Sequence, residues 1–188
     1  KAVGGEADAL LFDLEDAVAD ERQEIARQMV ADILTVNPDR SRQQLWVRIN
    51  PLDSDLSLPD LAAVMRGKPD GIILPKTYSA AEVNRLGDFL SALEAREGIE
   101  QGATKILCVA TETASSLVTF ESYIRDVTDR LVGLTWGGED LAAALGASDN
   151  RHPVTGDYDE PYLLARTFTL ATARAIDVQP VGSVFVDF

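Results

Sequence analysis

The sequence is poor in the residues that build disulfides and zinc sites: its 188 residues include one cysteine and one histidine. Cys108 cannot form an internal disulfide, which fits a reducing compartment, so the cytoplasm is the expected location. No apolar run approaches the roughly 20 residues that span a bilayer. The first residues lack the apolar stretch of a signal peptide, so none is expected.

Basic residues are scarce as well, because 17 Lys and Arg stand against 31 Asp and Glu, for a formal charge of −14. This balance argues against nucleic acid and anionic membranes as partners, since both require a cationic surface. The negative net charge does not exclude a small anionic ligand, because binding of such a ligand depends on the local field of its pocket. Such a ligand requires a few well-placed cations or a metal ion.

Short apolar runs alternate with longer stretches in which apolar residues recur at helical spacing. Six runs are expected to be strands: 9–12, 45–49, 71–74, 105–110, 131–136 and 183–188. The intervening stretches are expected to be helices, one of them opened by a capping box of Ser79 and Glu82. Another is expected to contain both Leu117 and Val127, and the last to begin near Pro161.

This alternation favours an α/β fold with a parallel sheet covered by helices. A (β/α)₈ TIM barrel typically has about 250 residues, so at roughly 30 residues per unit about six βα units are present. We therefore expect one barrel domain over residues 1–188, truncated at both ends, with the first and last strands missing. An open doubly wound sheet is the alternative, although no G-x-G-x-x-G sequence follows a predicted strand.

Each predicted strand is followed by, or ends with, an ionisable residue. In strand order these are 13–16 (DLED), Arg48 with the nearby Asn50, Lys76, Glu112, Glu139 with Asp140, and Asp187. Loops are polar in general, but the segments that precede the strands mostly carry ordinary turn residues. Because ligands bind at the carboxyl ends of parallel strands, the set predicts a binding site at that edge.

The residue types in this set indicate a metal site for an anionic substrate. Carboxylates gathered in one pocket repel one another unless a cation neutralises them, and carboxylates with water suit Mg²⁺ or Mn²⁺. Arg48 and Lys76 can hold a substrate carboxylate or phosphate, Arg48 in a bidentate manner. Gly137 and Gly138 allow the backbone to approach a ligand closely or to turn sharply, with Asp140 in the first helical turn. Such a site can stabilise an enolate or chelate a 2-oxo or 2-hydroxy acid.

At these same positions the sequence resembles the HpcH/HpaI aldolase/citrate lyase β-subunit family. The matching segments are LLFDLEDAV (10–18), VRIN (47–50), GIILPK (71–76), ETA (112–114) and GGEDLAAALG (137–146). They occur in the order found in the family and cover most of the chain, and DLEDAV and GGEDL are the more specific ones.

The resemblance implies a TIM barrel in which Glu112 and Asp140 hold Mg²⁺. It makes Arg48 the residue that binds the acyl or oxo-acid portion of the substrate and stabilises developing negative charge. Arg48, Glu112 and Asp140 are thus the expected catalytic residues. Glu15 and Asp16 are expected beside the water ligands of the metal.

The resemblance also implies the reaction. Family members cleave malyl-, citramalyl- or citryl-thioesters to an acetyl thioester and a 2-oxo acid, so a CoA thioester is the expected substrate. The resemblance makes Lys76 a nearby polar support. An aldolase acting on free 2-oxo acids such as pyruvate is one alternative. A second alternative is a citrate lyase β subunit that acts on an acyl-carrier-protein thioester. A third is a non-catalytic subunit of a complex. The family commonly forms trimers or hexamers, so a homo-oligomer is expected.

Some positions depart from the family pattern. Residues 181–184 read VGSV where the family often has Ile-Asp-Thr-Val, and the Ile-His-Pro segment of the eighth strand is not present. His152 is expected in a surface loop, and Cys108 is expected to be a buried core thiol. Trp136 is expected either to line a pocket or to pack in the core.

Overall fold

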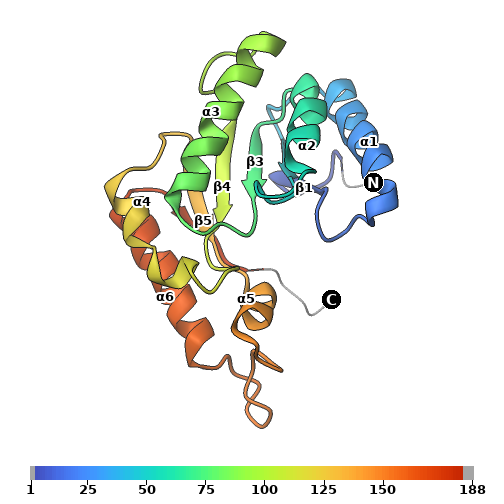
Figure 1. The fold of residues 1–188 in the computed structure, drawn as a ribbon. Coiled ribbons are helices and arrows are strands. Elements are labelled where there is room, and N and C mark those ends of the chain that lie inside the picture. Colours follow the sequence, from blue (N-terminus) through green and yellow to red (C-terminus); the bar gives the residue numbers. More distant parts are fainter. Residues whose placement is uncertain (1–2, 184–188) are drawn as a thin grey trace. The chain divides into compact units, whose positions relative to one another are not determined.

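A computed structural model describes residues 3–183 of the chain (Figure 1). The strands are β1 (Ala9–Asp13), β2 (Gln44–Arg48), β3 (Gly71–Leu74), β4 (Lys105–Val109), β5 (Leu131–Thr135) and β6 (Gln179–Pro180). The α-helices are α1 (Gln23–Val36), α2 (Ser57–Val64), α3 (Ala80–Glu97), α4 (Glu121–Arg125), α5 (Gly138–Leu145) and α6 (Glu160–Ala175). Short 3₁₀ turns are η1 (Asp20–Arg22), η2 (Met65–Gly67) and η3 (Ser116–Val118).

Hydrogen bonding links the strands into one sheet in the order β1-β2-β3-β4-β5-β6. β1 pairs with β2, β2 with β3 and β5 with β6, each pair in parallel. A doubly wound sheet reverses its strand order at a switch point, whereas the strands of a (β/α)₈ barrel follow one another in sequence order. The strand order therefore confirms the predicted α/β fold with six βα units of an incomplete barrel.

The chain forms two compact units. Unit 1 consists of Lys1–Leu74 and Arg85–Ile106, and unit 2 consists of Pro75–Asn84 and Leu107–Phe188. The prediction of one barrel domain over residues 1–188, cut at both ends, is not tested by this division and stays a prediction.

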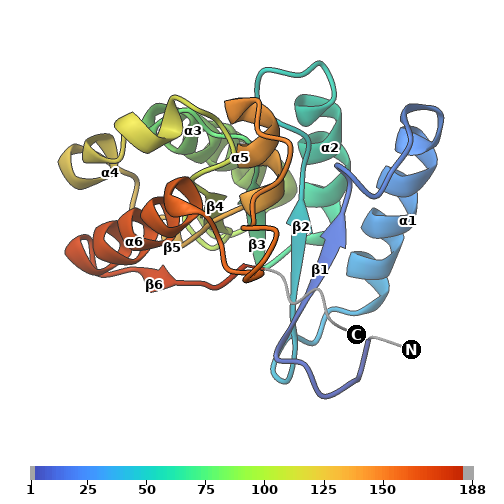
Figure 2. The ribbon, with the colours of Figure 1, turned by 90° about the horizontal axis from the view of Figure 1, so that it is seen from below.

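Unit 1 is built around β1, β2 and β3. All four residues of β3 (GIIL) are buried, as expected of a parallel strand that is covered on both faces. In unit 1 α1 and α2 pack side by side, as both views show (Figures 1 and 2). The most deeply buried side chains of this core include Leu34, Val47 and Leu61.

Unit 2 has a second apolar cluster, formed where β5 leads into α5 and α6. Trp136, Leu141 and Tyr162 pack together there with two alanines. The capping box predicted for α3 is formed: the Glu82 carboxylate accepts the Ser79 N–H at 2.9 Å. Within residues 3–183 no helix is both long and apolar enough to cross a membrane.

The single helix predicted to contain both Leu117 and Val127 is wrong. The structure has η3 and the short α4 instead, and Asp126, directly before Val127, is extended (φ −160°). Serine and threonine hydroxyls compete for the carbonyls of this segment. For example, the Ser122 hydroxyl donates to the Thr119 carbonyl at 2.7 Å, and such local bonds disfavour a continuous helix.

The predicted last strand, 183–188, lies outside the described residues except for Ser183. Asp187, predicted at its end, is therefore outside them as well. Within the described range, the strand that pairs with β5 is β6, at Gln179–Pro180. The other strand boundaries agree with the predicted ones to within one residue.

Candidate functional site

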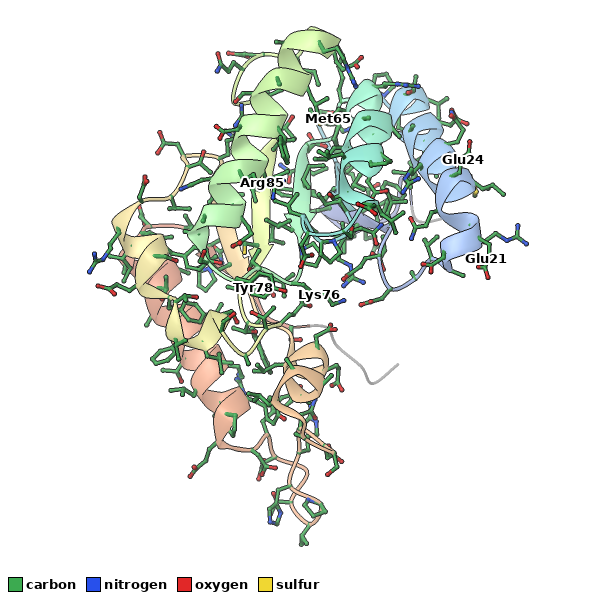
Figure 3. The ribbon with its side chains drawn as sticks, in the orientation of Figure 1. Glu21, Glu24, Met65, Lys76, Tyr78 and Arg85 are labelled. Atoms are coloured by element: carbon green, nitrogen blue, oxygen red, sulfur yellow. The ribbon has the colours of Figure 1, made fainter. Side chains whose placement is uncertain are left out.

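In unit 2, Lys76, Glu112 and Asp140 lie together: the first two are on the loops after β3 and β4, and Asp140 is in the first turn of α5, after β5. Lys76 lies on the loop between β3 and α3 (Figure 3). Its backbone N–H donates to Glu112 Oε2 at 2.7 Å, and its Nζ lies 3.3 Å from Asp140 Oδ1. The two carboxylates predicted to hold a metal therefore contact the same lysine, one through its backbone and one through its side chain.

Lys76 adopts an unusual backbone conformation, with φ at 50° in the left-handed region. Residues other than glycine seldom adopt this conformation, so it requires support from the surrounding structure. In this left-handed conformation the Lys76 N–H is directed at the buried carboxylate of Glu112.

Gly137 provides the space that Glu112 occupies. Its backbone is extended (φ −120°), a conformation open to any residue, so backbone freedom is not the reason for glycine. A Cβ at this position would lie 2.8 Å from Glu112 Cγ and 2.9 Å from Glu112 Oε1. Gly138 opens α5, and a Cβ there would lie 3.3 Å from its nearest neighbour, Trp136. The close approach seen at Gly137 is thus to a protein carboxylate, and the predicted approach to a ligand stays a prediction.

The donors in this cluster fit a hard cation. Mg²⁺ loses its water reluctantly and is usually bound through one or two carboxylates, with water completing its shell. Glu112 and Asp140 supply such a pair, and oxygen donors alone do not favour soft metals. Within residues 3–183 no group of three or more His, Cys, Asp or Glu side chains could hold a metal ion, so a site at Glu112 and Asp140 requires water ligands.

In unit 1, Arg48 is the centre of an acidic cluster at the ends of β1 and β2. Asp13 and Arg48 are paired residues of the two strands. The guanidinium donates from Nε to Asp13 Oδ1 at 2.7 Å and from Nη2 to Asp13 Oδ2 at 2.6 Å. Its Nη1 lies 3.0 Å from Glu15 Oε2 and 3.5 Å from Asp16 Oδ2. Asp13 takes the Nε–Nη2 edge and Glu15 and Asp16 lie against Nη1, so an anionic substrate would have to compete with these acids for the guanidinium.

The charges of this cluster reinforce one another. Burial lowers the pKa of Arg48, but hydrogen bonds to Asp13 and the charges of Asp13, Glu15 and Asp16 outweigh burial and hold that pKa above its ordinary value. Burial raises the pKa of Asp13, but the bonds from Arg48 and from the N–H groups of Glu15 and Ala17 outweigh it, so the pKa of Asp13 is lowered. The pair therefore stays ionised at neutral pH.

Asp13 is the residue that sequence reasoning left without a role. Its position directly after an apolar run is the same signal that identified the other candidates. The sequence could not show which of the three acids in 13–16 would take the bidentate position. The strand register decides this, because it places Asp13 directly opposite Arg48.

A buried polar network supports the loop that carries these acids. The Asn50 amide donates to the Leu14 carbonyl at 2.9 Å and to Asp60 Oδ2 at 2.8 Å. Asp60 is fully buried, and its Oδ1 accepts from Arg27 Nε at 2.6 Å. The loop after β1 is thereby connected to both α1 and α2, which limits the movement of the Arg48 cluster.

The other singled-out residues have structural roles. The His152 Nδ1 accepts the N–H of Val154 in an exposed loop, as expected for a surface histidine. Cys108 is buried, and burial raises its pKa to about 11, which agrees with a core thiol. Trp136 packs in the apolar cluster of unit 2, so of its two predicted roles the structure supports core packing.

The predicted site residues thus form two groups. Arg48 lies with Glu15 and Asp16 in unit 1. The residues predicted for metal and substrate binding in unit 2 are Lys76, Glu112, Gly137, Gly138 and Asp140. In unit 2, Lys76 contacts both Glu112 and Asp140, and Gly137 adjoins Glu112. Their roles in binding and catalysis stay predictions.

Comparison with known proteins places these features in a family context. A family model described as HpcH/HpaI aldolase/citrate lyase matches residues 1–188. Citrate lyase subunit beta of Haemophilus influenzae is 33% identical over 178 residues, covering 95% of this chain and 58% of that protein. The mitochondrial citramalyl-CoA lyase of Mus musculus is 30% identical over 190 residues, covering 96% of this chain and 54% of that protein. The chain spans less than three fifths of the length of these relatives.

The fold is similar to that of solved structures as well. A crystal structure of protein CitE from Mycobacterium tuberculosis, in complex with magnesium, acetoacetate and coenzyme A, matches with a TM-score of 0.75. The two chains are 30% identical, and the match covers 97% of this chain and 59% of that one. The likeness therefore extends to sequence and fold together.

Proposed function

The chain belongs to the HpcH/HpaI aldolase/citrate lyase family, and we propose that the whole protein is an Mg²⁺-dependent carbon–carbon lyase of the CoA-ester type. Its substrate is a malyl-, citramalyl- or citryl-CoA thioester, and its products are an acetyl thioester and a 2-oxo acid. The observation that carries this proposal is the pairing of Glu112 and Asp140 on Lys76, because it provides two hard donors for one cation.

In this proposal Glu112 and Asp140 are the protein ligands of the metal. The Lys76 N–H holds the Glu112 carboxylate, and the space left by Gly137 allows that carboxylate to lie against the backbone. When bound, Mg²⁺ supplies Lewis-acid polarisation of a chelated hydroxy- or oxo-acid oxygen. Mn²⁺, which also prefers oxygen donors, is an alternative ion.

Arg48 is assigned to the negative charge of the substrate. Its guanidinium stays protonated because Asp13 and the neighbouring acids hold its pKa high. The bidentate bond to Asp13 fixes the plane of the guanidinium, which lowers the entropy cost of orienting it toward an acyl carboxylate or a developing enolate. The predicted places of Glu15 and Asp16 beside metal-bound water belong to the same proposal.

The names of the relatives support a CoA thioester as substrate. One relative is a citramalyl-CoA lyase, and the similar CitE structure contains magnesium, acetoacetate and coenzyme A. The citrate lyase β subunits among the relatives favour a second candidate, cleavage of a thioester carried by an acyl-carrier protein. An aldolase acting on free 2-oxo acids is the third. The cytoplasmic location and the trimeric or hexameric state expected from the family stay predictions.

The test is acetyl-CoA release by the purified full-length protein from malyl-, citramalyl- and citryl-CoA, with and without EDTA. We expect EDTA to stop the reaction, and Glu112→Gln or Asp140→Asn to reduce kcat/KM by at least about 100-fold, since each removes a charged metal ligand. Glu139→Gln is the matched control, because Glu139 adjoins Asp140 but accepts a hydrogen bond from Asn150 at 2.7 Å. It should retain activity.

The outcome separates the candidates. Turnover only with a carrier-protein thioester favours the β-subunit function, and turnover of free 2-oxo acids without any CoA ester favours the aldolase. Cleavage of CoA esters that persists in EDTA contradicts the proposal.

A further inference from the structure

We propose that Thr111 and Thr113, which flank Glu112 in the chain, are positioning residues that set the spacing of the metal-binding carboxylates. This inference rests on the proposed function, because it concerns the same Mg²⁺ site. Each threonine makes its hydrogen bond to a different neighbouring loop, so that the loop carrying Glu112 is connected on both sides.

Thr111 connects Glu112 to the start of α5, the helix that carries Asp140. Its side chain is fully buried, and its hydroxyl oxygen accepts the N–H of Gly137 at 3.0 Å. Gly137 is the residue whose missing Cβ leaves room for Glu112, and Asp140 follows three residues later in the first turn of α5. The hydroxyl therefore fixes the start of α5 relative to Glu112.

Thr113 connects Glu112 to the loop that carries Lys76. Its hydroxyl donates to the Thr77 carbonyl at 3.1 Å. Thr77 directly follows Lys76, the residue with the left-handed backbone whose N–H binds the Glu112 carboxylate. By holding the carbonyl of the residue that follows Lys76, Thr113 supports the backbone conformation on which that N–H bond depends.

Thr77 is itself anchored in the interior of unit 2. It is buried, and its hydroxyl donates to the Val109 carbonyl of β4 at 3.0 Å. The same oxygen lies 3.3 Å from Cys108 Sγ and 3.3 Å from the Tyr123 hydroxyl. Thr77 thus donates a hydrogen bond to the end of β4 and accepts one from the loop that follows β4, and the two bonds together make this connection rigid.

These bonds differ from the usual threonine bond within a helix, because each one joins two separate loops. Metal ligands have to be held within about 0.5 Å of their productive positions, and that precision comes from such supporting bonds. Loss of a group that bonds a metal ligand directly typically lowers metal affinity by about 10- to 100-fold, and these threonines act one bond further from the metal, so the smaller end of that range is expected. Replacement by valine keeps the shape of threonine but removes the hydroxyl.

The experiment measures the Mg²⁺ dissociation constant of the full-length protein by isothermal titration calorimetry. We expect Thr111→Val and Thr113→Val each to weaken Mg²⁺ binding by about 10-fold, the smaller end of the range for supporting groups. Thr111→Ser and Thr113→Ser keep the hydroxyl and should restore affinity close to the wild-type value. Thr169→Val is the matched control, because Thr169 is a buried threonine whose hydroxyl bonds the Ala165 carbonyl of its own helix at 2.8 Å.

The control should bind Mg²⁺ as the wild type does, even where its thermal stability is lower. The inference is overturned if the two valine variants bind Mg²⁺ like the wild type, or if the serine variants bind as weakly as the valine variants. If wild-type protein and Glu112→Gln bind Mg²⁺ equally, or if neither binds it, the proposed metal site itself fails. That result is distinct from a failure of the threonines alone.

Discussion

Replacement of Gly137 by alanine tests the geometry of the carboxylate site directly. The new Cβ would lie 2.8 Å from Glu112 Cγ, whereas carbon atoms in favourable contact are about 3.5–4.0 Å apart. Because φ at this position is −120°, alanine introduces no backbone strain and the effect is steric. Glu112 would have to move away by roughly 1 Å to restore a normal contact distance.

The structure allows the cost of that movement to be estimated. A displacement of roughly 1 Å stretches the 2.7 Å bond from the Lys76 N–H beyond hydrogen-bonding distance. Loss of a bond to a charged group costs about 1.5–3 kcal/mol, and overpacking adds about 1–3 kcal/mol. Alanine also lowers the conformational entropy of the unfolded chain, which stabilises the folded state by about 0.4–1 kcal/mol. We therefore expect a net loss of about 3 kcal/mol, or about 6–12 °C in Tm.

The measurement is thermal unfolding by calorimetry, with a parallel Mg²⁺ titration. Gly138→Ala is the matched control, since its Cβ would lie 3.3 Å from Trp136 and requires a shift of only a few tenths of an ångström. It should unfold near the wild-type temperature. If Gly137→Ala is as stable as Gly138→Ala and binds Mg²⁺ as tightly as the wild type, then Glu112 does not lie where this reasoning requires.

Two further predictions concern unit 1. Asp13→Asn should cost about 1–2 kcal/mol at pH 7 in denaturant unfolding, because Arg48 loses the charge of its bidentate partner. The pKa of Asp13 is lowered in the folded state, so this contribution is complete above the unfolded pKa near 3.9 and disappears as pH falls through the folded pKa. Asp60→Ala should cost about 3–5 kcal/mol in thermal unfolding, because it leaves Arg27 and Asn50 without their buried acceptor.

Both predictions have a control in the exposed pair of Asp8 and Arg42, whose carboxylate is fully accessible to solvent. Asp8→Asn should change stability very little, since exposed ion pairs contribute little. The reasoning about Arg48 is contradicted if Asp13→Asn is no more destabilising than Asp8→Asn, or if the difference between wild type and Asp13→Asn grows as pH falls from 5 to 3. A small effect of Asp60→Ala would contradict the role given to the buried network.

The regular part of the fold could be predicted because short apolar runs in a parallel sheet are buried on both faces. β3 is the clearest case, since the predicted run and the observed strand coincide at Gly71–Leu74. The segment after Glu112 could not be predicted in the same way. Its apolar residues have helical spacing, but the hydroxyls of Ser116 and Ser122 bond nearby carbonyls and divide it into two short turns. Spacing rules do not include this competition.

The candidate site was predictable where the position of a residue after a strand was sufficient. This rule selected Lys76, Glu112 and Asp140, and the structure brings these three together. It did not select Thr111 or Thr113, because isolated threonines carry no signal in a single sequence. Their importance depends on which loops lie opposite them, and that information exists only in the folded chain.

The two carboxylates of unit 2 differ in exposure and in the group that each one contacts. Glu112 is 6% exposed and accepts a backbone N–H, a bond that does not use the Lys76 side chain. The Asp140 side chain is 32% exposed and meets the Lys76 ammonium, a contact that a divalent cation can replace. Like charges repel, so the ammonium has to withdraw from Asp140 when an ion of charge +2 binds there. Under the proposed function we therefore expect Glu112, held by the Lys76 N–H, to be the fixed ligand and Asp140 to be the ligand whose lysine contact the metal replaces.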